Sequence, residues 1–206
     1  MSTDEPGDGE APAPRWFTDT DDGHSHAYVA HFRQLATEGV DIVGEARLVD
    51  ALVAPGSLVL DAGCGPGRVA SELHRRGHHV VGVDVDQTLV EAAQADHDGP
   101  RWVVADLLTL DLPERRPGFD AVVCAGNVLP YLAPSTERQV LRRLFDHVHP
   151  DAVAVFGFGL DRGYALGDFD VDAEAAGWVL EHRFATWDLR PWHAGADFAV
   201  SVLRRP

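Results

Sequence analysis

The segment LVLDAGCGPGRVA, residues 58–70, constrains the fold more than any other stretch of this sequence. An apolar run ends at Asp61, three glycines follow between positions 63 and 67, and an amphipathic pattern begins after them. This order is typical of a strand, a tight turn and a helix, which together place backbone N–H groups and a helix N-terminus at the carboxyl edge of a parallel sheet. Ligands bind at that edge in such folds.

The rest of the chain repeats this alternation. Short apolar segments separated by helical patterns cover residues 57–60, 79–83, 102–105, 119–125 and 152–160. Such segments indicate a parallel sheet with helices on both faces. Two further strand patterns, 179–187 and 198–203, have no helix between them and are expected to pair antiparallel. We therefore expect an α/β, doubly wound, Rossmann-like fold: a mostly parallel seven-stranded sheet with an antiparallel C-terminal edge strand.

The length of 206 residues suits one well-packed domain and is short for two. Residues 1–22 carry seven acidic residues against Arg15, together with several prolines and glycines, and are expected to form an acidic disordered tail. The remaining residues, 23–206, are expected to form a single domain. Within it, residues 23–54 would form an N-terminal helical lid and residues 55–206 the ligand-binding sheet.

Composition excludes several classes of function. All 17 basic residues are arginine, so neither a Schiff-base lysine nor a Walker-type lysine exists. The net charge of −16 and the lack of a clustered basic segment argue against a nucleic-acid ligand. No apolar run approaches the ~20 residues that a bilayer span needs, and two cysteines form no disulfide framework. A cytoplasmic protein without a membrane partner is expected.

The glycine turn departs from the dinucleotide fingerprint G-x-G-x-x-G. Arg68 stands where that fingerprint has its third glycine, and Pro66 lacks the amide N–H that a pyrophosphate would use. A carboxylate at Asp61 would also repel a pyrophosphate in a low-dielectric cleft. A ligand with positive charge at this point fits better, and S-adenosylmethionine carries a sulfonium and an ammonium beside its adenosine. An NAD(P)-dependent oxidoreductase on a related fold remains the alternative.

With these residues, the segment VLDAGCGPGR resembles the first motif of the class I S-adenosylmethionine-dependent methyltransferases. Asp61, Gly63, Gly65 and Gly67 stand at the matching positions, and the resemblance continues from about residue 28 along most of the chain. It implies S-adenosylmethionine as cofactor and a small-molecule methyl acceptor as partner. A non-catalytic module that binds S-adenosylmethionine is a further alternative, and the oligomeric state is expected to be monomer or homodimer.

The resemblance also implies roles for single residues. Asp84 would accept both ribose hydroxyls, Asp106 would receive the adenine amino group, and Leu107 would pack on the adenine ring. Either acid, taken singly, is also compatible with a helix N-cap or a turn. Tyr28 matches an aromatic residue near the methionine carboxylate, or else is a core residue paired with Phe32. The full set expected to bind cofactor is Tyr28, Asp61, Gly63, Cys64, Gly65, Gly67, Arg68, Asp84, Val85, Asp106, Leu107, Ala125 and Asn127.

No single catalytic motif is expected, because methyl transfer from a sulfonium is an in-line displacement that mainly requires alignment and exclusion of water. Candidates for the acceptor side are Asn127, Tyr131 and His193, although His193 also fits simple surface exposure. His24 and His26 are of a type that zinc prefers, but no fixed third ligand is evident and no metal is expected. A separate hypothesis is that one of them folds over the cofactor.

Overall fold

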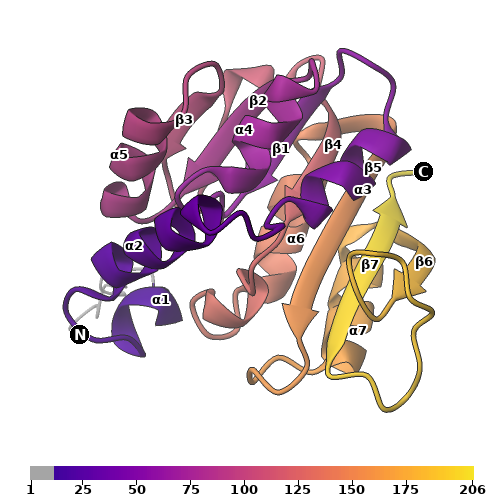
Figure 1. The fold of residues 1–206 in the computed structure, drawn as a ribbon. Helices are drawn as coiled ribbons and strands as arrows, with labels where there is room; N and C mark the ends of the chain where they lie inside the picture. The colour runs from indigo at the N-terminus through magenta and orange to yellow at the C-terminus, as the bar shows by residue number, and fades with distance from the viewer. Residues whose placement is uncertain (1–11) are drawn as a thin grey trace, which may run out of the picture.

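In the part of the chain that the structure describes, seven strands form one sheet in the order β3-β2-β1-β4-β5-β7-β6 (Figure 1). The structure, a computed structural model, describes residues 12–206. β1 to β5 pair in parallel, and β7 runs antiparallel to both of its neighbours. The strands are β1 Leu58–Ala62, β2 His79–Asp84, β3 Arg101–Val104, β4 Phe119–Cys124, β5 Val148–Gly159, β6 Val179–Phe184 and β7 Phe198–Arg204.

Helices cover both faces of the sheet and confirm the expected doubly wound α/β fold (Figure 1). The α-helices are α1 Arg15–Thr18, α2 His24–Thr37, α3 Gly44–Leu52, α4 Arg68–Arg75, α5 Gln87–Asp96, α6 Glu137–Phe145 and α7 Leu166–Ala176. Two short 3-10 helices, η1 Pro113–Arg115 and η2 Leu129–Tyr131, lie in the loops before and after β4. Within residues 12–206, no helix combines the length and the apolar character needed to cross a bilayer.

The antiparallel strand β7 lies one place in from the edge, between β5 and β6. Its central side chains are buried, whereas most of those on β6 are exposed. The order of the two strands follows from this difference in polarity. Glu181, His182 and Arg183 on β6 suit a sheet edge, and the apolar Ala199–Leu203 segment of β7 occupies the interior.

Alternation along the strands divides the core between the two faces of the sheet. On one face, Leu60 and Ala62 of β1 belong to the cluster that includes buried residues of α6 and α7. On the other face, Val59 packs with buried residues of α3 and α4. Asp61 alternates to this second face, so its carboxylate meets the beginning of α4.

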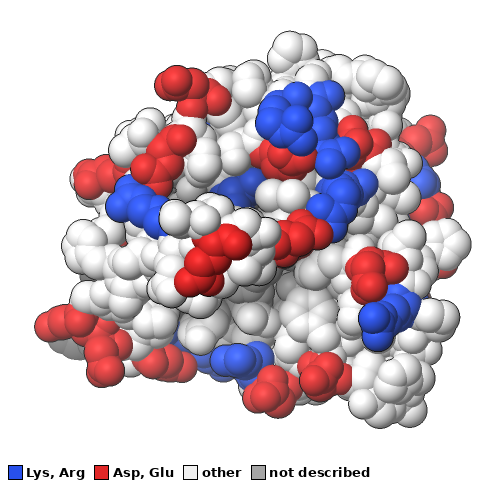
Figure 2. All heavy atoms as spheres, viewed as in Figure 1, with Lys and Arg blue, Asp and Glu red and all other residues white. Residues whose placement is uncertain are grey.

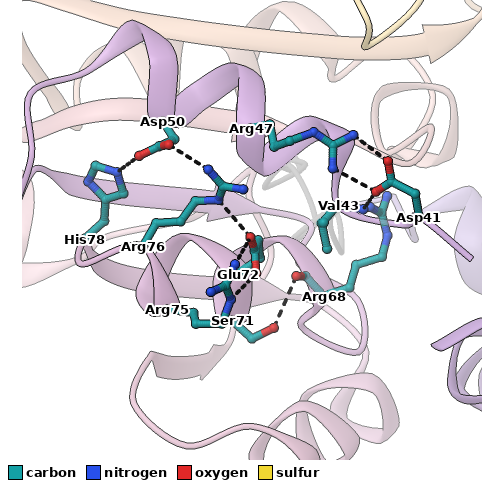
Figure 3. A network of polar contacts seen from close by, with 10 residues as sticks. All are labelled: Asp41, Val43, Arg47, Asp50, Arg68, Ser71, Glu72, Arg75, Arg76 and His78. Carbon is teal, nitrogen blue, oxygen red and sulfur yellow. Dashed lines mark hydrogen bonds and ion pairs between the residues drawn. The ribbon is translucent and has the colours of Figure 1, made fainter. Parts of the chain in front are cut away.

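A polar network fastens α3 to α4 (Figure 3). Asp50 on α3 accepts a hydrogen bond from Arg76 at 2.8 Å and pairs with His78 at 3.0 Å. Glu72 on α4 contacts both Arg75 and Arg76. Hydrogen bonds from His78 and Arg76 hold the pKa of Asp50 below its usual value. The network fixes the position of α4, whose N-terminus faces the glycine turn.

The expected acidic disordered tail over residues 1–22 is wrong for the part that the structure describes. Residues 15–18 form α1, and Arg15 binds the backbone carbonyl of Pro130 at 3.3 Å. Trp16 packs against Tyr28 and Tyr131. Trp16 supplies enough apolar surface to order this segment, although the average composition of the segment is polar. Residues 1–11 lie outside the described residues.

The two helices expected to form a lid over residues 23–54 have different positions. α2 lies against α5, where Val29 packs with Leu89 and Ala92. α3 belongs to the layer of helices on the sheet, and its Ala46 and Val49 are completely buried. Of these two helices, only α2 is therefore placed to cover a ligand at the edge of the sheet.

Candidate functional site

A cavity opens at the carboxyl ends of β1, β2 and β4, with about 820 Å³ of empty space including its open mouth. This volume is in the range of small-molecule and cofactor sites. We call it the central cavity. Of the residues expected to bind cofactor, all but Gly67 and Asn127 line it: Tyr28, Asp61, Gly63, Cys64, Gly65, Arg68, Asp84, Val85, Asp106, Leu107 and Ala125.

The glycine turn forms the floor of the central cavity. The N–H groups of Gly63 and Cys64 both donate to the carbonyl of Val83, at 2.8 and 2.9 Å, and so fasten the turn to the end of β2. Gly63 has φ +80°, and a Cβ there would lie 2.2 Å from a methyl carbon of Val128. Only glycine fits this position, because both the conformation and the space exclude a side chain.

Asp61 brings a buried carboxylate to the wall of the cavity. The residue is 2% exposed, and its Oδ2 accepts a hydrogen bond from the N–H of Ala70 in the first turn of α4 at 3.0 Å. Burial raises the pKa of Asp61 to about 7, against the opposing effects of Arg68 and of the Ala70 hydrogen bond. A buried carboxylate with this environment is stabilised by a cation placed in the cavity.

Asp84 ends β2 and joins the turn to the next loop. Its Oδ2 accepts from the N–H of Gly65 at 2.8 Å, and its Oδ1 accepts from the N–H of Asp86 at 3.0 Å. Burial raises the pKa of Asp84 to about 6 although these hydrogen bonds oppose the shift. A carboxylate held in this way offers its remaining lone pairs to a neighbouring pair of hydroxyl groups.

Asp106 and Leu107 follow β3 on the same side of the cavity as Asp84. Asp106 Oδ1 accepts from the N–H of Leu108 at 2.8 Å, so the acid stabilises a turn as well as lining the cavity. Leu107 is 5% exposed and forms part of the main core cluster. The arrangement offers a polar edge and an apolar surface next to each other, as a nucleobase requires.

Arg68 lines the cavity, but its guanidinium is engaged elsewhere. It donates to the carbonyl of Ile42 and to Glu45, each at 2.5 Å, and lies 5.2 Å from the centre of the Phe32 ring. The arginine therefore ties α4 to α2 and α3. Glu45 pairs with this guanidinium, although the charge of Arg68 still opposes the rise in the pKa of Asp61.

Tyr28 on α2 fits both interpretations of its role. Its ring makes an edge contact with Phe32 at 4.9 Å between centroids, and it also lines the central cavity above Gly65 and Gly126. Burial raises the pKa of its phenol, so the hydroxyl is protonated at neutral pH and can donate a hydrogen bond. Tyr131, at the end of η2, lines the cavity beside it.

Three predicted site residues lie outside the cavity lining. Gly67 caps α4 with φ +89°, and a Cβ there would lie 2.6 Å from Trp102 and 3.0 Å from Ala93, so its role is close packing. Asn127 accepts the N–H of Gly159 at 2.7 Å and links the loops after β4 and β5. His193 is exposed in the loop between β6 and β7.

Sequence reasoning missed several lining residues, among them Pro14, Trp16, Leu89, Val128 and Leu132. Trp16 was detectable, because a tryptophan in an acidic, Pro- and Gly-rich segment needs a place to bury its ring. His24 contacts this ring at 4.8 Å between centroids. Within residues 12–206, no three His, Cys, Asp or Glu side chains are grouped to hold a metal ion.

Comparison with known proteins identifies the family to which this chain belongs. The family described as "Methyltransferase domain" matches residues 59–151. The crystal structure of a TehB-like S-adenosylmethionine-dependent methyltransferase from Corynebacterium glutamicum is 41% identical, with a TM-score of 0.85 over 90% of this chain and 100% of that one. The chain belongs to the S-adenosylmethionine-dependent methyltransferase family. The resemblance carried by residues 58–70 is thereby confirmed.

Other relatives of this methyltransferase-family chain are more partial. An uncharacterized methyltransferase from Mycobacterium tuberculosis is 46% identical over 79 residues, which cover 37% of this chain and 39% of that protein. The chain thus matches well under half the length of that curated relative. The structure of magnesium protoporphyrin IX methyltransferase from Synechocystis with bound S-adenosylmethionine is 21% identical, with a TM-score of 0.62 over 93% of this chain and 90% of that one, and shares the fold.

Proposed function

We propose that this chain transfers the methyl group of S-adenosylmethionine to a small-molecule acceptor in the central cavity. The observation that carries the proposal is the pair of buried carboxylates, Asp61 and Asp84, on either side of a glycine turn. These residues fit a cofactor that is cationic at one end and carries ribose hydroxyls at the other. The methyltransferase relatives support the same cofactor.

In this proposal, each part of the cavity has a defined task. Asp61 and the glycine turn would receive the amino-acid end of the cofactor, Asp84 the ribose, and Asp106 with Leu107 the adenine. When bound, S-adenosylmethionine supplies an activated methyl carbon, so that the protein needs to align the nucleophile and exclude water. The ring of Tyr28 and the side chain of Val128 help to keep the cavity dry.

The walls left for the acceptor are mainly apolar: Trp16, Val128, Tyr131 and Leu132. Arg68, the cationic residue of the lining, is paired with Glu45, so the walls favour a small molecule without a phosphate or carboxylate at its reacting end. On the face in Figure 2, several arginines gather near the top with acids beside them, and the other arginines are scattered among acids. The chain as a whole carries a net charge of −16. This acidic balance supports a small-molecule acceptor rather than nucleic acid. A cytoplasmic setting is part of the proposal.

The direct test is transfer of a labelled methyl group. The purified protein is incubated with S-adenosylmethionine labelled in its methyl group and a metabolite extract, and labelled small molecules are detected by mass spectrometry. We expect label in at least one small molecule. If the protein binds S-adenosylmethionine but labels nothing across a broad extract, it is a binding module without transferase activity.

The substitution Asp84→Ala tests whether Asp84 binds the cofactor. It removes two acceptor oxygens from the ribose position, and loss of two hydrogen bonds to a charged group weakens cofactor binding roughly a hundredfold or more. The matched control is Asp161→Ala, because Asp161 follows β5 at the same edge of the sheet, is exposed, and does not line the cavity. Calorimetric titration measures both. Unchanged affinity in Asp84→Ala, with the fold intact, would place the ribose elsewhere.

A further inference from the structure

Asp86, two residues after the end of β2, connects two distant parts of the chain. Its Oδ1 accepts the N–H of Thr88 at 2.8 Å and so caps α5. Its Oδ2 accepts the indole N–H of Trp16 at 2.7 Å and also the hydroxyl of Ser25. The same carboxylate therefore begins α5 with one oxygen and holds the N-terminal segment, residues 14–25, with the other.

Trp16 is the centre of an aromatic cluster at the central cavity. Its ring makes edge contacts with His24 at 4.8 Å, Tyr28 at 5.5 Å and Tyr131 at 5.6 Å between centroids. Trp16, Tyr28 and Tyr131 all line the cavity. The position of one indole ring thus fixes a large part of the cavity wall, and Asp86 fixes that ring.

The hydrogen bond between Trp16 and Asp86 is short and partly buried. Asp86 is 4% exposed, and burial by itself would raise the pKa of its carboxyl. The hydrogen bonds from Ser25, Trp16 and Thr88 outweigh burial and hold that pKa below its usual value. The carboxylate is therefore ionised at neutral pH, and hydrogen bonds to an ionised acceptor are stronger than those between neutral groups.

Asp86 is also connected to the residue that we assign to the ribose, because its backbone N–H donates to Asp84 Oδ1 at 3.0 Å. The end of β2 thus supplies two acids with separate tasks. Asp84 lines the cavity, and Asp86 points to the N-terminal segment that covers it.

We propose that Asp86 is a positioning residue that seats Trp16 as a wall of the central cavity, so that a bound ligand and the seated N-terminal segment stabilise each other. The inference rests on the proposed function, since the ligand is the cofactor or its product S-adenosylhomocysteine. By linkage, the seated segment raises the affinity for the ligand by the same factor by which the bound ligand favours the seated segment. A variant that unseats Trp16 therefore lowers the affinity for the ligand by up to that factor. The sequence gives no sign of this, because Trp16 and Asp86 are 70 positions apart.

Asp86→Asn is the sharpest variant. Asparagine is as good an N-cap as aspartate, so α5 keeps its cap at the position of Oδ1. The amide nitrogen that replaces Oδ2 is a donor and cannot accept from Trp16 or Ser25. Asp96→Asn is the matched control: it makes the same change at the other end of α5 and replaces one of the two oxygens that accept from Arg33 on α2 at 2.8 and 3.0 Å, but Asp96 does not line the cavity.

Two measurements decide the proposal. Hydrogen exchange, read by mass spectrometry over residues 14–25, reports the seating of the segment, and calorimetry reports the affinity for S-adenosylhomocysteine. In Asp86→Asn we expect exchange of the segment to rise and affinity to fall, each roughly tenfold, with both unchanged in Asp96→Asn. Trp16→Phe, which keeps a ring but loses the indole donor, should reproduce the loss of affinity without touching α5.

The outcomes separate this inference from the proposed function. If the wild-type protein binds S-adenosylhomocysteine and Asp86→Asn binds it equally well with unchanged exchange, the positioning role is refuted and the proposed function stands. If the wild-type protein binds no sulfonium nucleoside or its product, the proposed function fails and the coupling fails with it. Should Asp86→Asn not fold, Trp16→Phe and Ser25→Ala decide the same question through the two donors.

Discussion

At the scale of single residues, Asp61 and Asp84 determine how the central cavity responds to charge. Both are buried acids facing one cavity, and burial raises the pKa of Asp61 to about 7 and that of Asp84 to about 6. In the ligand-free protein, each therefore becomes protonated in the mildly acidic range. A cationic ligand favours their ionised forms, so ligand binding and proton release are coupled.

We predict that affinity for S-adenosylmethionine rises as pH increases from about 5 to about 7.5, because below the two pKa values the cation must displace protons. Calorimetry over this range measures the trend and the proton release. Asp61→Asn keeps an acceptor for Ala70 and should flatten the upper part of the curve. An affinity independent of pH in the wild-type protein would contradict an ionisable pair at the ligand.

The same two shifts predict the opposite trend for stability without ligand. The pKa values of Asp61 and Asp84 are raised above those of the unfolded chain. The contribution of these two acids to the free energy of unfolding is therefore fully present below about pH 4 and is lost as pH rises through about 6 and 7. Urea titration of the wild-type protein and of Asp61→Asn isolates the part due to Asp61. The variant should depend less on pH over this range, and an unchanged slope would be inconsistent with the raised pKa.

At the scale of elements, the β1–α4 turn needs glycine at position 63 for two separable reasons. We predict that Gly63→Ala is destabilised by about 1 kcal/mol through its positive φ and by about 2 kcal/mol more through overlap with Val128. Gly56→Ala is the matched control, because Gly56 has the same φ of +80° but open space around it. Urea denaturation of the two single variants, and of the double variant Gly63→Ala with Val128→Ala, separates the cost of the positive φ from the cost of the overlap with Val128. Equal losses in Gly63→Ala and Gly56→Ala would show that the overlap is relieved at no cost.

Asn127 acts between two loops in this structure. It has φ +67°, and its side chain accepts the N–H of Gly159. We predict that Asn127→Ala loses about 2 kcal/mol of stability through the orphaned N–H and the strained backbone, whereas Asn127→Asp keeps the acceptor and most of the stability. Thermal unfolding and methyl transfer are measured together. If Asn127→Ala is stable but inactive, the residue acts on the substrate after all.

At the scale of the whole molecule, alternating apolar strands and helices were sufficient to predict the sheet and its two layers of helices. The order of β6 and β7 was not accessible in this way, because pairing across a long connection depends on which strand is more apolar on both faces. The same limit applies to the N-terminal segment. Its average composition indicates disorder, while its structure depends on Trp16 and on a carboxylate far away in the sequence, Asp86.

The candidate site was predictable where chemistry acts through residues next to strand ends, as for Asp61, Asp84 and Asp106. It was less predictable where a motif residue serves packing, as Gly67 does against Trp102. Residues such as Val128 and Leu132 reach the cavity only through tertiary structure. No local pattern marks them, so the acceptor side was the part of the site that sequence could describe least.

The central claim is that the acids around the glycine turn select a cationic sulfonium nucleoside and reject a dinucleotide. Parallel calorimetric titrations of the wild-type protein with S-adenosylmethionine, S-adenosylhomocysteine and NAD test it most directly. We predict saturable binding at one site for both sulfur compounds and no measurable heat with NAD. Tighter binding of NAD than of either sulfur compound would contradict the account.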